Sequence, residues 1–125
     1  MRPRRWLEIR YLDSVPDTLW PAVVFMTTTL LDDPGAAAIA AEATAPVATA
    51  WDRAARVGLS DRRLQDAAVA CVSAAAERAP AELAESMEQL TRSVQEGRCP
   101  ADDFADRVVS HGIASAMSQL VKGEL

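Results

Sequence analysis

One segment of this chain alternates like a β-strand, and its isolation limits the possible folds more than any other feature. In residues 5–13 (RWLEIRYLD), Leu7 and Ile9 fall on one face, while Glu8 and Arg10 fall on the other. The sequence that follows reads as helix throughout. A solitary strand leaves its backbone N–H and C=O groups without partners, and even an isolated hairpin is marginal in water. We therefore expect the partner strands to come from outside this sequence.

Composition and charge exclude several classes of protein. Half of the 125 residues are apolar, which is too many for a disordered chain, and the length allows one domain but not two. The net charge of −5 argues against a nucleic-acid or anionic-membrane partner, because phosphate binding needs clustered Lys and Arg. The most apolar run, Val23–Leu31, is far shorter than the roughly 20 residues of a membrane span. Cys71 and Cys99 show no metal-binding or disulfide spacing, so we expect a reduced cytoplasmic protein.

Proline, glycine and acidic residues divide the remaining sequence into about five or six helices. The predicted segments are Trp20–Leu31, a stretch from Ala36 to Arg56 that breaks at Pro46, a helix capped by Ser60 and closed by Pro80, a helix carrying Leu83, Met87, Leu90 and Val94, and a last helix from Pro100 to Val121 weakened by Gly112. We expect Asp33 and Thr44 to cap helix starts and Gly97 to end a helix in the left-handed conformation. The first helix is apolar on nearly every side, which predicts a buried central helix. Residues 1–125 thus read as a single incomplete domain, with its strand over about residues 5–12.

Residue spacing alone does not identify a catalytic or metal-binding site on the strand. A carboxylate and a guanidinium two positions apart, as in Glu8 and Arg10, most often form ion pairs with neighbouring strands on a solvated face. The other candidate residues also have structural interpretations. Trp6, Tyr11, Trp20, Trp51 and Cys71 are predicted packing residues, Cys99 a helix-boundary residue packed against the body, and His111 a surface or helix-packing residue.

Several segments, however, resemble one enzyme family. Residues 6–13 (WLEIRYLD) resemble the Glu-x-Arg-x-x-Asp strand of glutamate–cysteine ligases, the ATP-dependent enzymes that make γ-glutamylcysteine. Four further segments resemble, in the correct order, the C-terminal third of the actinobacterial type, which supplies ergothioneine biosynthesis. They are LLDDP (30–34), EATAPV (42–47), AARVGL (54–59) and GRCPADD (97–103). The resemblance implies a fold that is mainly α with one N-terminal strand, the C-terminal part of the α+β, glutamine synthetase-like ligase fold.

The resemblance also implies roles for three residues of the strand region. In the family the strand Glu is one of several carboxylates that hold the Mg²⁺ ions bridging the ATP phosphates, and Glu8 stands in this position. The family Arg that reaches the transferring phosphoryl group corresponds to Arg10, whose planar guanidinium can bind two phosphate oxygens. Asp13 matches the third position, as a turn-forming residue or one that supports the ligands from behind. The implied reaction is phosphorylation of the glutamate γ-carboxylate by ATP, followed by attack of the cysteine amine.

One predicted metal ligand cannot by itself assemble an Mg²⁺–ATP site, which needs several fixed oxygen atoms. We therefore expect this chain alone to lack ligase activity and to act with the missing N-terminal part of the ligase or with a second copy. Glutamate, cysteine and ATP are the implied substrates of the complete enzyme, although related ligases with this strand join glutamate to other amines. The alternative is a truncated, non-catalytic helical module that dimerises or binds a partner through its exposed strand, because unpaired strand edges recruit other chains.

Overall fold

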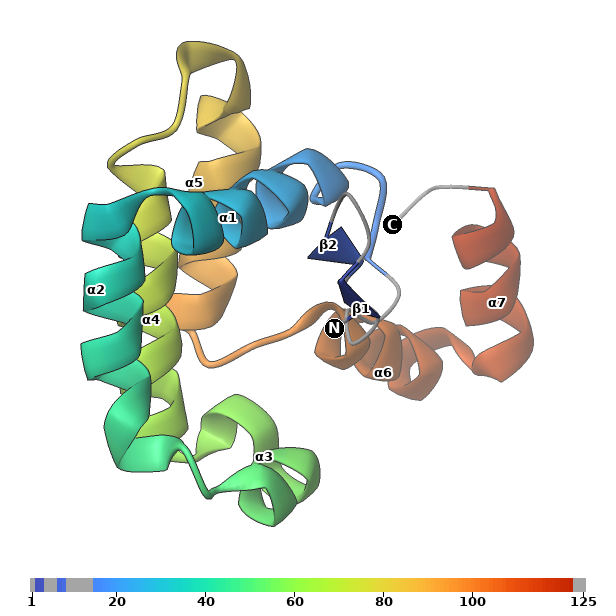
Figure 1. Cartoon of the computed structure of the whole chain (residues 1–125). Coiled ribbons are helices and arrows are strands. Elements are labelled where there is room, and N and C mark those ends of the chain that lie inside the picture. The colour runs from blue at the N-terminus through green and yellow to red at the C-terminus, as the bar shows by residue number, and fades with distance from the viewer. Residues whose placement is uncertain (1, 4–6, 9–14, 123–125) are drawn as a thin grey trace.

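The structure, a computed structural model, describes residues 2–3, 7–8 and 15–122 (Figure 1). Two short strands, β1 (Arg2–Pro3) and β2 (Leu7–Glu8), precede the helices. The α-helices in the described part of the chain are α1 (Trp20–Asp32), α2 (Pro34–Thr44), α3 (Trp51–Val57), α4 (Arg62–Ala76), α5 (Ala84–Gln95), α6 (Pro100–His111) and α7 (Ile113–Val121). Short 3₁₀ helices at Ala45–Val47, Gly58–Ser60 and Ala81–Leu83 lie at the junctions.

The core forms where α1, α4 and α5 meet. The helices α2 and α4 run side by side, and α1 crosses one end of this pair (Figure 1). The buried cluster contains Ala22 from α1, Val72 and Ala75 from α4, and Met87 and Val94 from α5. Small side chains at helix contacts allow the helix axes to approach closely. The body is therefore held by close packing of alanine-rich faces rather than by a large aromatic core.

The junction between α1 and α2 confirms the predicted cap at Asp33. Its carboxylate accepts a hydrogen bond of 2.7 Å from the backbone N–H of Ala36, and Pro34 occupies the first helical position. The same carboxylate accepts a second hydrogen bond, also of 2.7 Å, from Nε of Arg78, which follows α4. Asp33 therefore both starts α2 and ties the junction to the end of α4.

The predicted break at Pro46 is confirmed, because α2 ends at Thr44 and α3 begins only at Trp51. The predicted cap at Thr44 is wrong. Its hydroxyl donates backward to the carbonyl oxygen of Ala40 at 2.7 Å, so it caps no following helix. A threonine within a helix commonly bonds to the carbonyl four residues earlier, and here this local bond is preferred over capping.

The cap of α4 lies one residue later than predicted. Ser60 ends the preceding 3₁₀ helix, and Asp61 takes the N-cap position with an extended backbone. The Asp61 carboxylate accepts hydrogen bonds from the backbone N–H groups of Arg63 and Leu64, at 2.9 and 3.2 Å. The side chain of Arg53 in α3 pairs with the same carboxylate. A carboxylate has enough acceptor positions to cap α4 and to bind Arg53 of α3 at the same time, whereas a serine hydroxyl has too few.

The last predicted helix is in fact two helices. Gly97 follows α5 with a φ of 71°, which confirms the predicted left-handed end. Gly112 has a φ of 79°, so α6 ends at His111 and α7 begins in a new direction at Ile113. The two helices pack mainly on each other and lie to one side of the body formed by α1, α2, α4 and α5 (Figure 1).

The predicted fold class is wrong. The sequence predicts a piece of an α+β fold, with one strand over about residues 5–12 and its partners outside the chain. The described residues instead form a mainly helical structure. The strand β2 covers only Leu7–Glu8. Its partner is β1 of the same chain, antiparallel, with Arg2 opposite Glu8 and Pro3 opposite Leu7. Backbone groups can pair with a segment only a few residues away, and Pro3 lacks the N–H that a longer ladder needs.

The helix α1 is not buried on all sides, contrary to the prediction. Ala22 and Val23 are buried, whereas Trp20, Val24 and Leu31 expose 49%, 42% and 43% of their surfaces. The other described elements thus cover only one face of a helix that is apolar all round. Within the described ranges, no helix combines the length and apolar character that a membrane span requires.

Candidate functional site

The residues that the sequence predicts for a site lie at and after β2. Glu8 is the last residue of β2, and Arg2 of β1 is its partner in the ladder. Arg10 and Asp13 lie outside the described residues, as do Trp6 and Tyr11. The described part of this site is therefore one short ladder that ends at Glu8, and the roles of the other residues stay predictions.

A groove of about 320 Å³ lies beside the start of α1. The turn before α1, together with α5 and α6, provides its walls. The lining residues are Pro16, Thr18, Leu19, Gln89, Pro100, Asp103, Asp106 and Arg107. The groove therefore joins the turn before α1 to the acidic first half of α6, two segments that are far apart in the sequence.

The two carboxylates in this groove are already paired. The guanidinium of Arg98 donates to Asp103 at 2.7 Å and to Asp106 at 2.6 Å, and these hydrogen bonds raise the pKa of Arg98 above its ordinary value. Paired carboxylates have fewer acceptor positions left for a metal ion. This network is not among the predictions from the sequence, although an Arg directly before an acidic helix start is a signal for it. The network fixes the entry into α6.

A second groove, of about 400 Å³, runs between α4 and α5. Alanines and Met87 form its apolar floor, and Glu88 and Arg92 pair at 2.8 Å on its rim. The lining residues are Ala76, Ala79, Ala84, Met87, Glu88, Thr91, Arg92 and Gln95. This arrangement is a gap between packed helices beside an exposed i, i+4 ion pair, and its lining contains no nucleophile beside a base.

Residues 2–3, 7–8 and 15–122 contain no group of three His, Cys, Asp or Glu side chains that could hold a metal ion. Magnesium in nucleotide-dependent enzymes takes oxygen ligands from carboxylates together with substrate phosphates. The described part of the chain thus does not form such a site on its own. Any site that includes Glu8 needs further ligands.

Two of the segments that carry the family resemblance are helix junctions. In residues 30–34, the hydrogen bond from the backbone of Ala36 is the main reason why the pKa of Asp33 is lowered. In residues 97–103, the Asp102 carboxylate accepts a hydrogen bond of 2.7 Å from the backbone N–H of Cys99, which completes a capping box and lowers the pKa of Asp102. These segments hold the helices in place and do not contact a described reaction centre.

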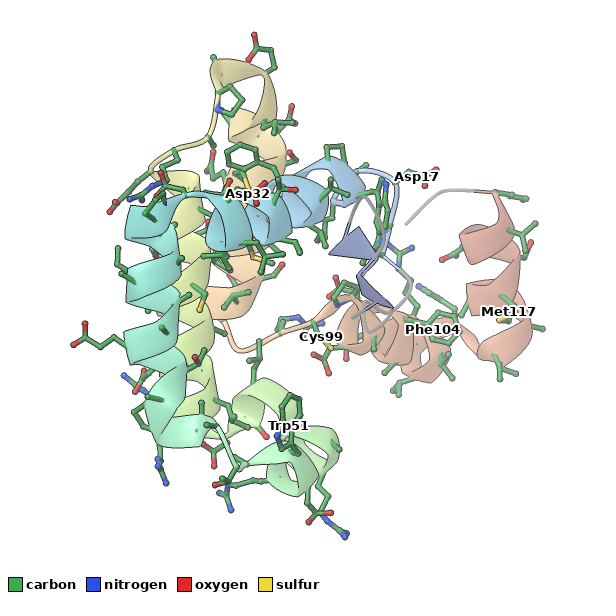
Figure 2. All side chains as sticks on the ribbon, in the orientation of Figure 1. Asp17, Asp32, Trp51, Cys99, Phe104 and Met117 are labelled. Atoms are coloured by element: carbon green, nitrogen blue, oxygen red, sulfur yellow. The ribbon has the colours of Figure 1, made fainter. Side chains whose placement is uncertain are left out.

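The remaining candidate residues lie at or near the surface. Trp51, labelled in Figure 2, is 82% exposed on α3, so its predicted packing role is wrong. Trp20 exposes 49% of its surface. Cys71 is half-buried, and burial raises the pKa of its thiol. Cys99 stands at the N-cap of α6 as predicted but is exposed, and His111 is exposed at the end of α6.

Comparisons with known proteins identify the family. The sequence profile of glutamate–cysteine ligase family 2 (GCS2) matches residues 1–122. Glutamate–cysteine ligase EgtA of Mycolicibacterium smegmatis is 74% identical over 125 residues, which is all of this chain and 30% of that relative. EgtA of Mycobacterium tuberculosis is 61% identical over 123 residues, or 98% of this chain and 28% of the relative.

No solved structure matches the chain. The chain spans less than a third of the length of the curated relatives, and the family profile covers almost all of it. The resemblance to the glutamate–cysteine ligases is thereby confirmed. The chain belongs to glutamate–cysteine ligase family 2.

Proposed function

We propose that this chain supplies the C-terminal part of an ATP-dependent glutamate–cysteine ligase. The observation that carries the proposal is the 74% identity to EgtA of M. smegmatis over the whole chain. In the proposed reaction, the γ-carboxylate of glutamate attacks the γ-phosphorus of ATP, which gives γ-glutamyl phosphate and ADP. The cysteine amine then attacks the acyl phosphate. The new amide bond forms as phosphate leaves, and the amine loses a proton.

Within this reaction, Glu8 and Arg10 are the proposed working residues of the chain. Glu8 is one of the carboxylates that hold Mg²⁺, and the ion offsets negative charge on the phosphates when it is bound. Arg10 binds the transferring phosphoryl group through its guanidinium, and Asp13 supports the segment that carries both. The position of Glu8 on a paired strand favours this role, because regular elements hold side chains more firmly than loops do.

We further propose that the chain has no ligase activity by itself. The described residues contain no cluster of three possible metal ligands, and the reaction also needs binding surfaces for ATP, glutamate and cysteine. These are assigned to the rest of the ligase, since the relatives are more than three times as long as this chain. The product γ-glutamylcysteine matches the use of the actinobacterial enzymes in ergothioneine biosynthesis.

The test is a chimera in which this chain replaces the matching 30% of M. smegmatis EgtA. We expect the chimera to release ADP and phosphate only when glutamate, cysteine and Mg²⁺ are all present, and the purified 125-residue chain to release none. Glu8→Gln and Arg10→Lys are each expected to lower kcat of the chimera at least about 100-fold. Glu8→Gln should also raise the Mg²⁺ concentration that gives half-maximal rate.

Glu42→Gln and Arg56→Lys are the matched controls, because both residues are exposed on helices away from the strands. We expect them to leave kcat unchanged. Turnover by the free chain would refute its proposed inactivity. A folded chimera without activity would refute the ligase assignment and favour a non-catalytic helical module.

A further inference from the structure

The solvent-facing side of α1 carries a continuous row of uncharged residues. Trp20, Val24, Thr28 and Leu31 are all exposed, at 49%, 42% and 43% for the three apolar ones. Their positions differ by 4, 8 and 11 residues, so at about 100° per residue they fall within an arc of about 80°. We call these four residues the α1 stripe.

The α1 stripe has the residue composition of a buried surface. No charged residue occurs between Asp17 and Asp32, the two acidic residues labelled beside α1 in Figure 2. The one polar side chain of the stripe is satisfied within the helix, since the hydroxyl of Thr28 donates to the carbonyl oxygen of Val24 at 2.8 Å. A surface helix normally has charged or polar residues on its outer face, whereas a helix that is apolar all round is covered on all sides.

We propose that the α1 stripe is the surface on which the rest of the ligase packs, an inference that rests on the proposed function. The relatives contain more than twice as much additional sequence as this chain contains, and the family profile spans α1. The stripe begins at Trp20, twelve residues after Glu8. A body that completes a site around Glu8 therefore lies within reach of the first turn of α1. Because the stripe is uncharged, the partner surface is aliphatic or aromatic and carries no unpaired charge.

Thiol labelling tests this packing independently of catalysis. Val24→Cys places a thiol in the α1 stripe, and Ala55→Cys places one on exposed α3, which lies at the opposite end of the helical body from α1 (Figure 1). Each variant is made both in the free chain and in the chimera with M. smegmatis EgtA, and alkylation is followed by mass spectrometry of the separated peptides. We expect the rate at position 24 to fall at least 10-fold in the chimera, and the rate at position 55 to stay the same.

Charged variants give a second readout. Val24→Asp should leave the melting temperature of the free chain within a few degrees of the parent, since Val24 is already exposed there, and should lower that of the chimera clearly. Ala55→Asp, the control, should change the melting temperature of neither the free chain nor the chimera.

Equal labelling rates at position 24 in the free chain and in an active chimera would overturn the inference and leave the proposed function standing. A chimera that protects position 24 but has no activity would support the packing of the α1 stripe and refute the proposed function. Labelling of the free chain that slows as its concentration rises would assign the stripe to a second copy of this chain, which also overturns the inference.

Discussion

Met87 has a special position among the residues of the core. It is 2% exposed and is the largest fully buried side chain of the described residues, in a core that otherwise consists of alanine, valine and one leucine. The other buried members of its cluster are alanines and valines, while larger side chains such as Phe25 pack against this cluster from partly buried positions. The period of Leu83, Met87, Leu90 and Val94 predicts this inward position from the sequence alone.

Met87→Ala is expected to lower the free energy of unfolding by about 2–5 kcal/mol, because it removes buried apolar contacts and leaves a cavity. Met117→Ala makes the same chemical change at a residue that is 46% exposed, and we expect it to cost less than about 1 kcal/mol. Urea unfolding monitored by circular dichroism measures both. A loss below about 0.5 kcal/mol for Met87→Ala would show that the α4–α5 packing is not as described.

At the scale of elements, acidic caps and left-handed glycines determine where the helices start and stop. Asp33 and Asp61 cap α2 and α4 and at the same time accept hydrogen bonds from arginines of other segments. Gly97 and Gly112 end α5 and α6. The sequence predicts most of these boundaries, because a cap depends on neighbouring residues. It misplaces the cap of α4 because the contact with Arg53, which favours Asp61 over Ser60, comes from another helix.

The pH dependence of stability follows from these caps. The hydrogen bond from Arg53, first of all, and those from the backbone of α4 lower the pKa of Asp61 in the folded state. A lowered folded-state pKa means that the stabilisation is present above the unfolded pKa of about 3.9 and is lost as the pH falls through the folded value. Asp61→Asn should therefore lower the melting temperature at pH 7 by about 5 °C, and this difference should shrink below about pH 4. Asp66→Asn on the exposed surface of α4 is the control, and a pH-independent difference for Asp61→Asn would contradict the prediction.

The two glycines allow a comparison of backbone strain with steric contact. Gly97 has a φ of 71°, and a Cβ there would lie 3.3 Å from Nε2 of Gln65 and 3.4 Å from the carbonyl oxygen of Leu59. Gly112 has a φ of 79° with open space around it. We expect Gly97→Ala to lower the free energy of unfolding by about 1–2 kcal/mol, and Gly112→Ala to have a smaller effect, because only the strain of the left-handed backbone applies there. Urea unfolding measures both, and a larger effect at Gly112 would contradict this account.

At the scale of the whole molecule, a small core is combined with a large exposed surface. The buried side chains are mostly alanines and valines, while ten large hydrophobic residues of the described part are exposed, among them Trp51 at 82% and Val109 at 87%. The hydrophobic contribution to stability is roughly proportional to the apolar area removed from water. The separate chain is therefore expected to be less stable than a complete domain of its length.

The free energy of unfolding of the isolated chain should lie below about 5 kcal/mol, under the usual range for native proteins. The same segment in the chimera with M. smegmatis EgtA should unfold at a higher urea concentration, because its apolar surfaces are then covered. Urea titration with linear extrapolation measures the first quantity, and hydrogen exchange of α4 peptides compares the two. A value above about 10 kcal/mol for the isolated chain would contradict the proposed incompleteness.

Local signals in the sequence determine most of the helical architecture. The breaks at Pro46 and Gly97 and the cap at Asp33 depend on residues within a few positions, so they can be read without coordinates. The family can also be read this way, from short segments in their correct order. The roles of Glu8 and Arg10 come from that resemblance, and neither periodicity nor spacing identifies them.

Only the tertiary structure decides which apolar faces are covered. Apolar periodicity marks every side of α1 as suited to burial, but burial also requires a partner, and the described elements cover one side only. The pairing of β2 with β1 and the exposure of Trp51 are of the same kind, because they depend on which segments meet in space. The hydrophobicity of a side chain is set by its residue type, but whether it is buried depends on which other segments contact it in the folded chain.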